Sequence, residues 1–155
     1  MSKFKLSIDE VNAGWATVSC SVSGIDLGLK ASCLRDSLAE LITATSGIAA
    51  CRGHFAEPRR VHWILEPGSI EWHLTGGDDG TLILSAREHE QAFATPERHT
   101  RVLATATLPA ARLVRSVLRA FDDLYDRVGP RDYETRWNHP WPAEAIARLR
   151  EMIRT

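Results

Sequence analysis

The chain has 155 residues, of which 44% are hydrophobic and 25% are charged. This composition is that of an ordinary globular protein, so it excludes a disordered, collagen-like or coiled-coil chain, and the length fits one domain over residues 1–155. The formal net charge is −1 with no strongly basic segment, which excludes a general nucleic-acid binder, and no apolar run approaches the ~20 residues of a membrane span.

Two segments near the start of the sequence predict a β-hairpin. Residues 3–11 place apolar side chains at every second position, residues 12–14 have turn composition, and residues 15–23 alternate again. A helix is predicted next, with Ser32 as its N-cap and Gly47 at its end. The residues that recur there at helical spacing are Leu34, Leu38, Leu41, Ile42 and Thr45.

Four alternating segments in the middle of the chain predict an antiparallel meander. They cover residues 59–66, 69–75, 81–88 and 101–108. Short turns of Pro-Gly and Gly-Gly-Asp-Asp-Gly composition separate the first three segments. The polar residues 89–99, between the third and fourth segments, are predicted to form a loop.

The apolar pattern also predicts how these strands pair. If Trp63 lies opposite Trp72, every apolar residue on that face meets an apolar partner. The same register places His62 opposite His73 on the other face. Continuing the apolar face into the next strand places Trp72 opposite Leu84. Both tryptophans are therefore predicted to be core residues.

The last third of the chain predicts two helices. Pro109 suits the first turn of a helix, a wide apolar stripe follows it, and a Gly-Pro pair ends it. A shorter helix begins near Ala143. Between the helices, Trp137 and Trp141 either fix the last helix to the body or form an exposed anchor for a partner. The order ββ-α-ββββ-α-α predicts an α+β fold, with helices packed on one antiparallel sheet of about six strands.

Two histidines are the most specific candidates for chemistry. His62 and His73 could hold a metal ion or act as acid and base, with Glu71 nearby in sequence; the alternative is a pair of solvent-facing side chains. No nucleophile motif or phosphate-binding loop occurs. We therefore expect no enzyme activity, no cofactor and no metal, and we keep a metal-dependent or small-ligand enzyme using His62 and His73 as the alternative.

The cysteines and the first residues predict a cellular location. The chain has 3 cysteines, an odd number, and they show no zinc-type spacing. The first residues contain no apolar segment of signal-peptide length. We therefore expect reduced thiols and a cytoplasmic protein.

Two motifs carry a resemblance to a group of small bacterial proteins. Residues 63–72 form a Trp-x-x-Glu-Pro-Gly-x-x-x-Trp hairpin, and residues 137–142 form a Trp-x-His-Pro-aromatic-Pro segment. Over roughly residues 32–155 the chain resembles these proteins, which are similar to immunity proteins of polymorphic and contact-dependent toxin systems. The resemblance implies a non-enzymatic α+β protein that binds and neutralises a cognate toxin domain. It implies no functional residue, because both motifs have a structural composition.

Charged residues supply the expected binding surfaces. A toxin that acts on nucleic acid tends to present a basic face, so its blocker is expected to be acidic there. The candidate carboxylates are Asp78, Asp79, Glu88, Glu90 and Glu97. The alternative surface is a basic stripe on the long helix, formed by Arg112, Arg115 and Arg119. Three aspartates follow this stripe, Asp122, Asp123 and Asp126, and Arg119 can pair with Asp123 one helical turn away. We expect a protein partner, with no membrane and no direct nucleic-acid contact.

Overall fold

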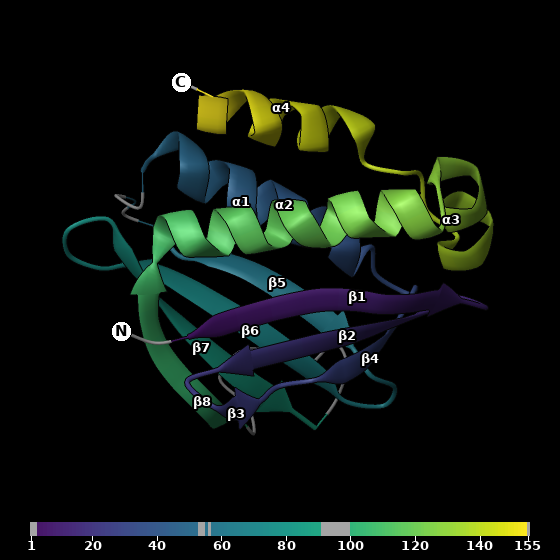
Figure 1. Ribbon diagram of the computed structural model, residues 1–155. Helices are drawn as coiled ribbons and strands as arrows, with labels where there is room; N and C mark the ends of the chain where they lie inside the picture. The colour runs from purple at the N-terminus through teal and green to yellow at the C-terminus, as the bar shows by residue number, and fades with distance from the viewer. Residues whose placement is uncertain (1–2, 53–54, 56, 91–99, 155) are drawn as a thin grey trace.

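The computed structural model describes residues 3–52, 55, 57–90 and 100–154. In these residues the chain forms eight strands and four helices in the order β1-β2-β3-β4-α1-β5-β6-β7-β8-α2-α3-α4 (Figure 1). The strands make two antiparallel sheets of four strands each, so the predicted single sheet is wrong although the α+β class is confirmed. No described helix is long and apolar enough to cross a membrane.

The first sheet is built around the predicted hairpin of β1 (Phe4–Asn12) and β2 (Trp15–Val22). Ala13 and Gly14 form a two-residue turn with φ values of 51° and 79°, the left-handed geometry that suits the twist of a hairpin. The short strands β3 (Ile25–Asp26) and β4 (Leu29–Ser32) both pair with β2. They lie between the predicted hairpin and α1.

The helix α1 (Ser37–Ala50) begins later and ends later than its pattern predicts. Asp36 is the N-cap, and its carboxylate accepts a hydrogen bond from the Ala39 backbone N–H at 3.3 Å. Ser32 instead ends β4, and Leu34 lies outside the helix with 61% of its surface exposed. Gly47 lies inside the helix, where a Cβ atom would stand 2.9 Å from Cζ of Arg59. The lack of a side chain at Gly47 therefore makes room for the arginine of the neighbouring strand.

The second sheet is the predicted meander of β5 (Arg59–Ile64), β6 (Ser69–Gly76), β7 (Thr81–His89) and β8 (Thr100–Pro109). Its register differs from the prediction by two residues. Trp72 lies opposite Val61 and Ala86, not Trp63 and Leu84. β5, the first strand of this sheet, ends at Ile64 and not at residue 66 as predicted, because Ile64 pairs with Ser69 across a four-residue loop.

A shift of two residues leaves every side chain on its predicted face, because strand side chains alternate with a period of two. Trp63 and Trp72 are accordingly both 0% exposed, which confirms the prediction that they are core residues. Their rings meet diagonally in an edge-to-face contact, with centroids 5.1 Å apart.

Three helices complete the chain: α2 (Ala110–Arg127), α3 (Pro130–Trp137) and α4 (Ala143–Arg154). The sequence pattern did not predict α3, which starts at the Gly-Pro pair expected only to end α2. Tyr133 and Trp137 lie one turn apart on α3 and are both 0% exposed. Trp137 donates from its indole Nε1 to Oδ1 of Asp36 at 2.9 Å, so α3 is fixed to the beginning of α1.

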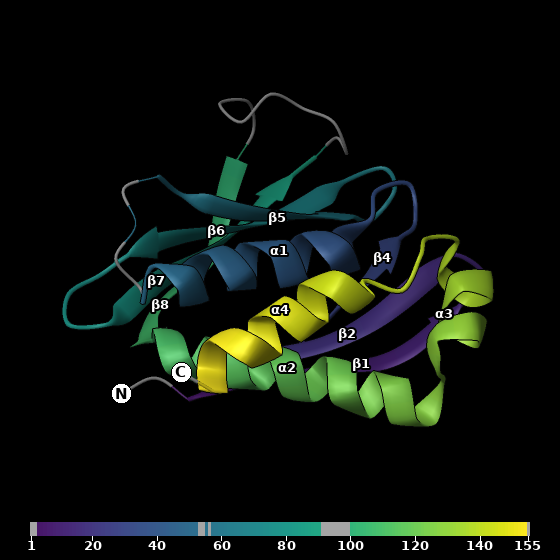
Figure 2. The same cartoon turned by 90° about the horizontal axis from the view of Figure 1, so that it is seen from above.

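The helices cover one side of the strands (Figure 1). Seen from above, α1 lies along β5, α2 lies beside β1, and α4 crosses over both helices (Figure 2). One continuous apolar core joins the two sheets to α1, α2 and the buried faces of α3 and α4. This arrangement leaves the outer face of the second sheet and the grooves between the helices as places for polar chemistry and binding.

Candidate functional site

The structure separates the predicted acidic residues into two groups. Asp78 and Asp79 are exposed in the turn between β6 and β7. Glu88 and Glu90 lie at the far end of β7, and at about 3.4 Å per residue a nine-residue strand keeps the two groups roughly 25–30 Å apart. Glu88 is paired with Arg101, with 3.3 Å between Oε1 and Nη2. Glu97 lies outside the described residues. These carboxylates therefore do not form one acidic surface.

The predicted basic stripe starts beside the Asp78/Asp79 turn. The backbone N–H of Ala110, at the start of α2, donates to the carbonyl oxygen of Gly80 at 2.9 Å. Arg115 and Arg119 are exposed on α2, and Arg112 is half-buried. The basic stripe is therefore a neighbour of the Asp78/Asp79 turn, but not of Glu88 and Glu90.

Asp123 takes a different partner from the one its spacing allowed. Its carboxylate pairs with Arg127, not Arg119, with 2.8 Å between Oδ2 and Nε. Arg127 also donates to the backbone carbonyl oxygens of Ile8 and Asp9. The contact therefore fixes the end of α2 to β1, which makes this ion pair structural.

The two predicted site histidines share the outer face of the second sheet but do not face each other. His62 lies opposite Glu71, and His73 lies opposite Arg60. The predicted cross-strand histidine pair is therefore wrong, because the register is shifted by two residues. Burial, followed by the positive charge of Arg87, lowers the pKa of His73 below its ordinary value.

A cluster of charged side chains surrounds Glu71, whose own side chain is only 5% exposed. Oε2 of Glu71 lies 3.7 Å from Nε2 of His62 and 3.6 Å from Nε2 of His89, and Oε1 lies 3.6 Å from Nε of Arg60. These groups come from three adjacent strands. Arg60 and His89 are the members that the sequence did not indicate. Residues 89–99 are predicted to form a loop, whereas β7 extends to His89.

Helix α1 orients His62 within this cluster. Oε1 of Glu40 lies 2.6 Å from Nδ1 of His62 and accepts the backbone N–H of the same residue at 2.7 Å. Burial raises the pKa of Glu40, but hydrogen bonds from His62 and Arg35 outweigh that effect, so the pKa lies below its ordinary value. A carboxylate that holds one imidazole nitrogen can prepare the other for proton transfer. Among the described residues, however, no group of three or more His, Cys, Asp or Glu side chains is arranged to hold a metal ion.

A pocket of about 440 Å³ lies between α2 and α4. It is lined by Asp122, Tyr125, Asp126, Trp141, Ala143, Ile146, Ala147 and Arg150, and we call it the aromatic–carboxylate pocket. Tyr125 is 53% exposed, and its ring centroid lies 5.8 Å from that of Trp141. Trp141 also makes edge contacts with Tyr133 and Phe121, at 4.9 and 5.9 Å between centroids. The rings beneath Trp141 therefore hold it in place while Tyr125 remains accessible.

The two carboxylates of this pocket have different partners. Asp122 is held by both terminal nitrogens of Arg150, and these hydrogen bonds raise the pKa of Arg150. Asp126 is exposed and makes no ion pair with any described residue. One open carboxylate beside two aromatic rings suits an alkylammonium or guanidinium group, which gains from both the charge and the ring faces.

The sequence contained only part of the signal for this pocket. The three aspartates after the basic stripe and the possible anchor role of Trp141 could be read from the chain. The position of α4, which supplies Arg150 and Ile146 as the facing wall, could not be read from the chain.

The chain matches no protein-family model, no curated protein and no solved structure.

Proposed function

We propose that this chain is a non-enzymatic binding protein that receives a basic side chain of a protein partner in the aromatic–carboxylate pocket. In its most concrete form it is a cytoplasmic immunity protein that occupies and neutralises a cognate toxin domain. The observation that carries the proposal is the exposed Tyr125 beside the fixed ring of Trp141 and the carboxylate of Asp126, which makes no ion pair with the residues that the structure describes.

Anchor residues of protein interfaces support this assignment. Tyrosine and tryptophan are enriched among the few side chains that supply most of the binding free energy, and they act from well-packed positions that exclude water. Trp141 has such a position, because Tyr133 and Phe121 pack against it. Tyr125 adds an accessible ring at the mouth of the same pocket.

The charge of the pocket selects the partner. Asp122 is already neutralised by Arg150, so Asp126 is the carboxylate that a partner can use. A toxin domain that acts on nucleic acid presents lysine and arginine because its substrate is a polyanion. The resemblance of the two tryptophan motifs to those of immunity-like proteins points in the same direction. The enzyme alternative lacks comparable support, since His62 faces Glu71 while His73 faces Arg60.

The test uses the product of the reading frame next to this one in the genome as the candidate partner. Affinity is measured by calorimetry for the wild type, Tyr125→Ala, Asp126→Lys and the control Glu57→Lys, which reverses an exposed charge between α1 and β5. Loss of an anchor residue costs about 2 kcal/mol or more, so we expect Kd to rise about 30-fold in the two pocket variants and to stay unchanged in the control. Folded pocket variants that bind as tightly as the wild type would rule out this surface.

A further inference from the structure

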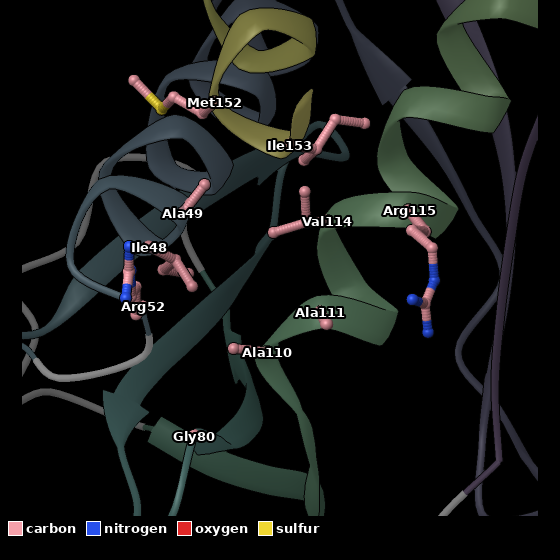
Figure 3. A pocket seen from close by; sticks show the side chains of 10 residues that line it. All are labelled: Ile48, Ala49, Arg52, Gly80, Ala110, Ala111, Val114, Arg115, Met152 and Ile153. Atoms are coloured by element: carbon pink, nitrogen blue, oxygen red, sulfur yellow. The ribbon is translucent and has the colours of Figure 1, made fainter. Parts of the chain in front are cut away.

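A second pocket, of about 470 Å³, lies at the opposite end of the helical layer (Figure 3). Ile48, Ala49 and Arg52 border it on the α1 side, and the first two turns of α2 border it on the other side. Met152 and Ile153 of α4 complete the wall, and Gly80 of the β6–β7 turn lies at its edge. We call it the α1–α2–α4 pocket. It shares no residue with the aromatic–carboxylate pocket.

The wall of this pocket is apolar. Ile48, Val114 and Met152 supply large side chains, while Ala49, Ala110 and Ala111 leave the space between the helices open. Ile153 is 47% exposed at the mouth, although Ile146 and Leu149 of the same helix are buried. An apolar cavity of this volume lies within the range of small-molecule sites.

The charged groups of the pocket are both cationic. Arg52 and Arg115 line it from opposite sides, and neither guanidinium makes an ion pair with a carboxylate of the described residues (Figure 3). Asp78 and Asp79 belong to the neighbouring turn and do not line the pocket. The first turn of α2 also carries no acidic side chain. A ligand that fits both the wall and the rim has an apolar body and a negative end.

We propose that the α1–α2–α4 pocket binds a small amphiphile whose apolar chain ends in a carboxylate. The chain lies against Ile48, Val114 and Met152, and the carboxylate lies at the rim, where Arg52 and Arg115 supply the positive charge. A guanidinium can donate two parallel hydrogen bonds to a carboxylate, which favours this head group over a neutral one. The proposal does not depend on the protein partner, because it rests on different residues.

The test compares decanoate, decanol and decylammonium, which share one chain and differ in head-group charge. Decanoate and decylammonium are titrated below their micelle concentrations and decanol below its solubility limit, with calorimetry for affinity and NMR for position. We expect decanoate to bind at one molecule per chain and to shift the amide signals of residues 48–52, 110–115 and 152–153. Charge-assisted contacts predict that decylammonium binds at least about tenfold more weakly. Equal affinity for the three compounds, or shifts elsewhere, would overturn the assignment.

Substitutions in the pocket test where the carboxylate of decanoate binds. Arg52→Gln with Arg115→Gln should weaken decanoate binding about tenfold, since both charge-assisted contacts are lost. Arg119→Gln is the matched control, because Arg119 is exposed one turn further along α2 and does not line the pocket. Ala111→Phe should fill the cavity and abolish binding. An equal loss in the Arg119→Gln variant would contradict the site, since it would show a general charge effect.

A final experiment distinguishes two kinds of ligand that both carry a terminal carboxylate: a small amphiphile and the C-terminus of a protein chain. A short peptide that ends in Leu can be prepared with a free carboxylate or with an amide. The proposal expects decanoate to bind more tightly than either peptide. If the free-acid peptide binds and decanoate does not, the pocket receives the end of a protein chain, and the small-amphiphile assignment is wrong.

Discussion

Trp137 and Asp36 lie 101 residues apart in the chain, and the indole Nε1 of Trp137 donates to Oδ1 of Asp36 at 2.9 Å. The same oxygen accepts the backbone N–H of Ala39 at 3.3 Å, so one carboxylate caps α1 and satisfies a buried indole. Trp141, which lines the aromatic–carboxylate pocket, follows Trp137 by four residues. The contact between Trp137 and Asp36 therefore helps to position that pocket.

Asp36 should accordingly be important for stability. Asp36→Ala removes the helix cap, which costs about 1 kcal/mol of stability. It also leaves the buried indole N–H without its acceptor, which costs about 1–3 kcal/mol. Asp36→Ser keeps a capping oxygen and loses the indole contact, together with the 3.8 Å contact between Oδ2 of Asp36 and Nδ1 of His139. We expect urea unfolding to rank the proteins wild type, then Asp36→Ser, then Asp36→Ala. An alanine variant as stable as the wild type would show that the contact contributes nothing.

The Trp63–Trp72 contact predicts that two substitutions of Trp72 lower the stability of the protein by different amounts. Trp72→Ala removes a fully buried ring and should cost about 3–5 kcal/mol, a large share of the roughly 5–15 kcal/mol that stabilise a domain. Trp72→Phe keeps an aromatic ring and deletes an indole N–H that has no hydrogen-bond partner among the described residues, so it should cost less. Thermal unfolding of both variants measures the difference. The prediction fails if the two changes lower Tm equally.

All three cysteines are free thiols, and they should differ in reactivity. Burial, together with the negative charge of Asp26, raises the pKa of Cys20 to about 12. The thiolate is the reactive form, so Cys20 should resist alkylation in the folded protein while Cys33 and Cys51, which are half-buried, react first. Mass spectrometry after a short iodoacetamide pulse tests this order. Denatured, unreduced protein should take up three labels, and early labelling of Cys20 would contradict its buried position.

The contact between Glu40 and His62 predicts that the free energy of unfolding falls at acidic pH. The pKa of Glu40 is lowered in the folded protein, so the folded state binds this proton less readily than the unfolded state. The stabilisation is therefore present above the ordinary pKa of about 4.5 and is lost as the pH falls through the lower folded value. Glu40→Gln should flatten this part of the curve of unfolding free energy against pH. Glu10→Gln, which removes an exposed carboxylate of β1, is the control for the loss of one negative charge. An unchanged fall at acidic pH in Glu40→Gln would contradict the role of this contact.

The faces of the strands could be predicted from the sequence, whereas their partners could not. Trp63 and Trp72 are buried as expected, because the alternation of side chains is local and survives a shift of two residues. Between β5 and β6 the shift comes from the loop after Ile64, whose four residues the Pro-Gly signal did not reveal. His62 therefore gained Glu71 as its neighbour and lost His73.

Contacts between distant segments account for what the sequence did not predict at the sites. Glu40 reaches His62 from a helix, and Arg150 reaches Asp122 from another helix 28 residues away. The short helix α3 lies between two proline-containing segments, so its eight residues carry too little periodicity to indicate a helix. The placement of α4 follows from α3, and with it the wall of the aromatic–carboxylate pocket.

The rate of association with the partner, measured against salt concentration, tests whether Asp126 receives a basic group of the partner. Stopped-flow fluorescence compares the wild type with Asp126→Lys, with circular dichroism as the check that the variant is folded. A carboxylate that meets a basic partner speeds encounter at low ionic strength and loses that effect as salt screens it. We expect Asp126→Lys to associate at least about tenfold more slowly at low salt and to show a shallower salt dependence. A folded variant that associates at the wild-type rate in low salt would contradict it.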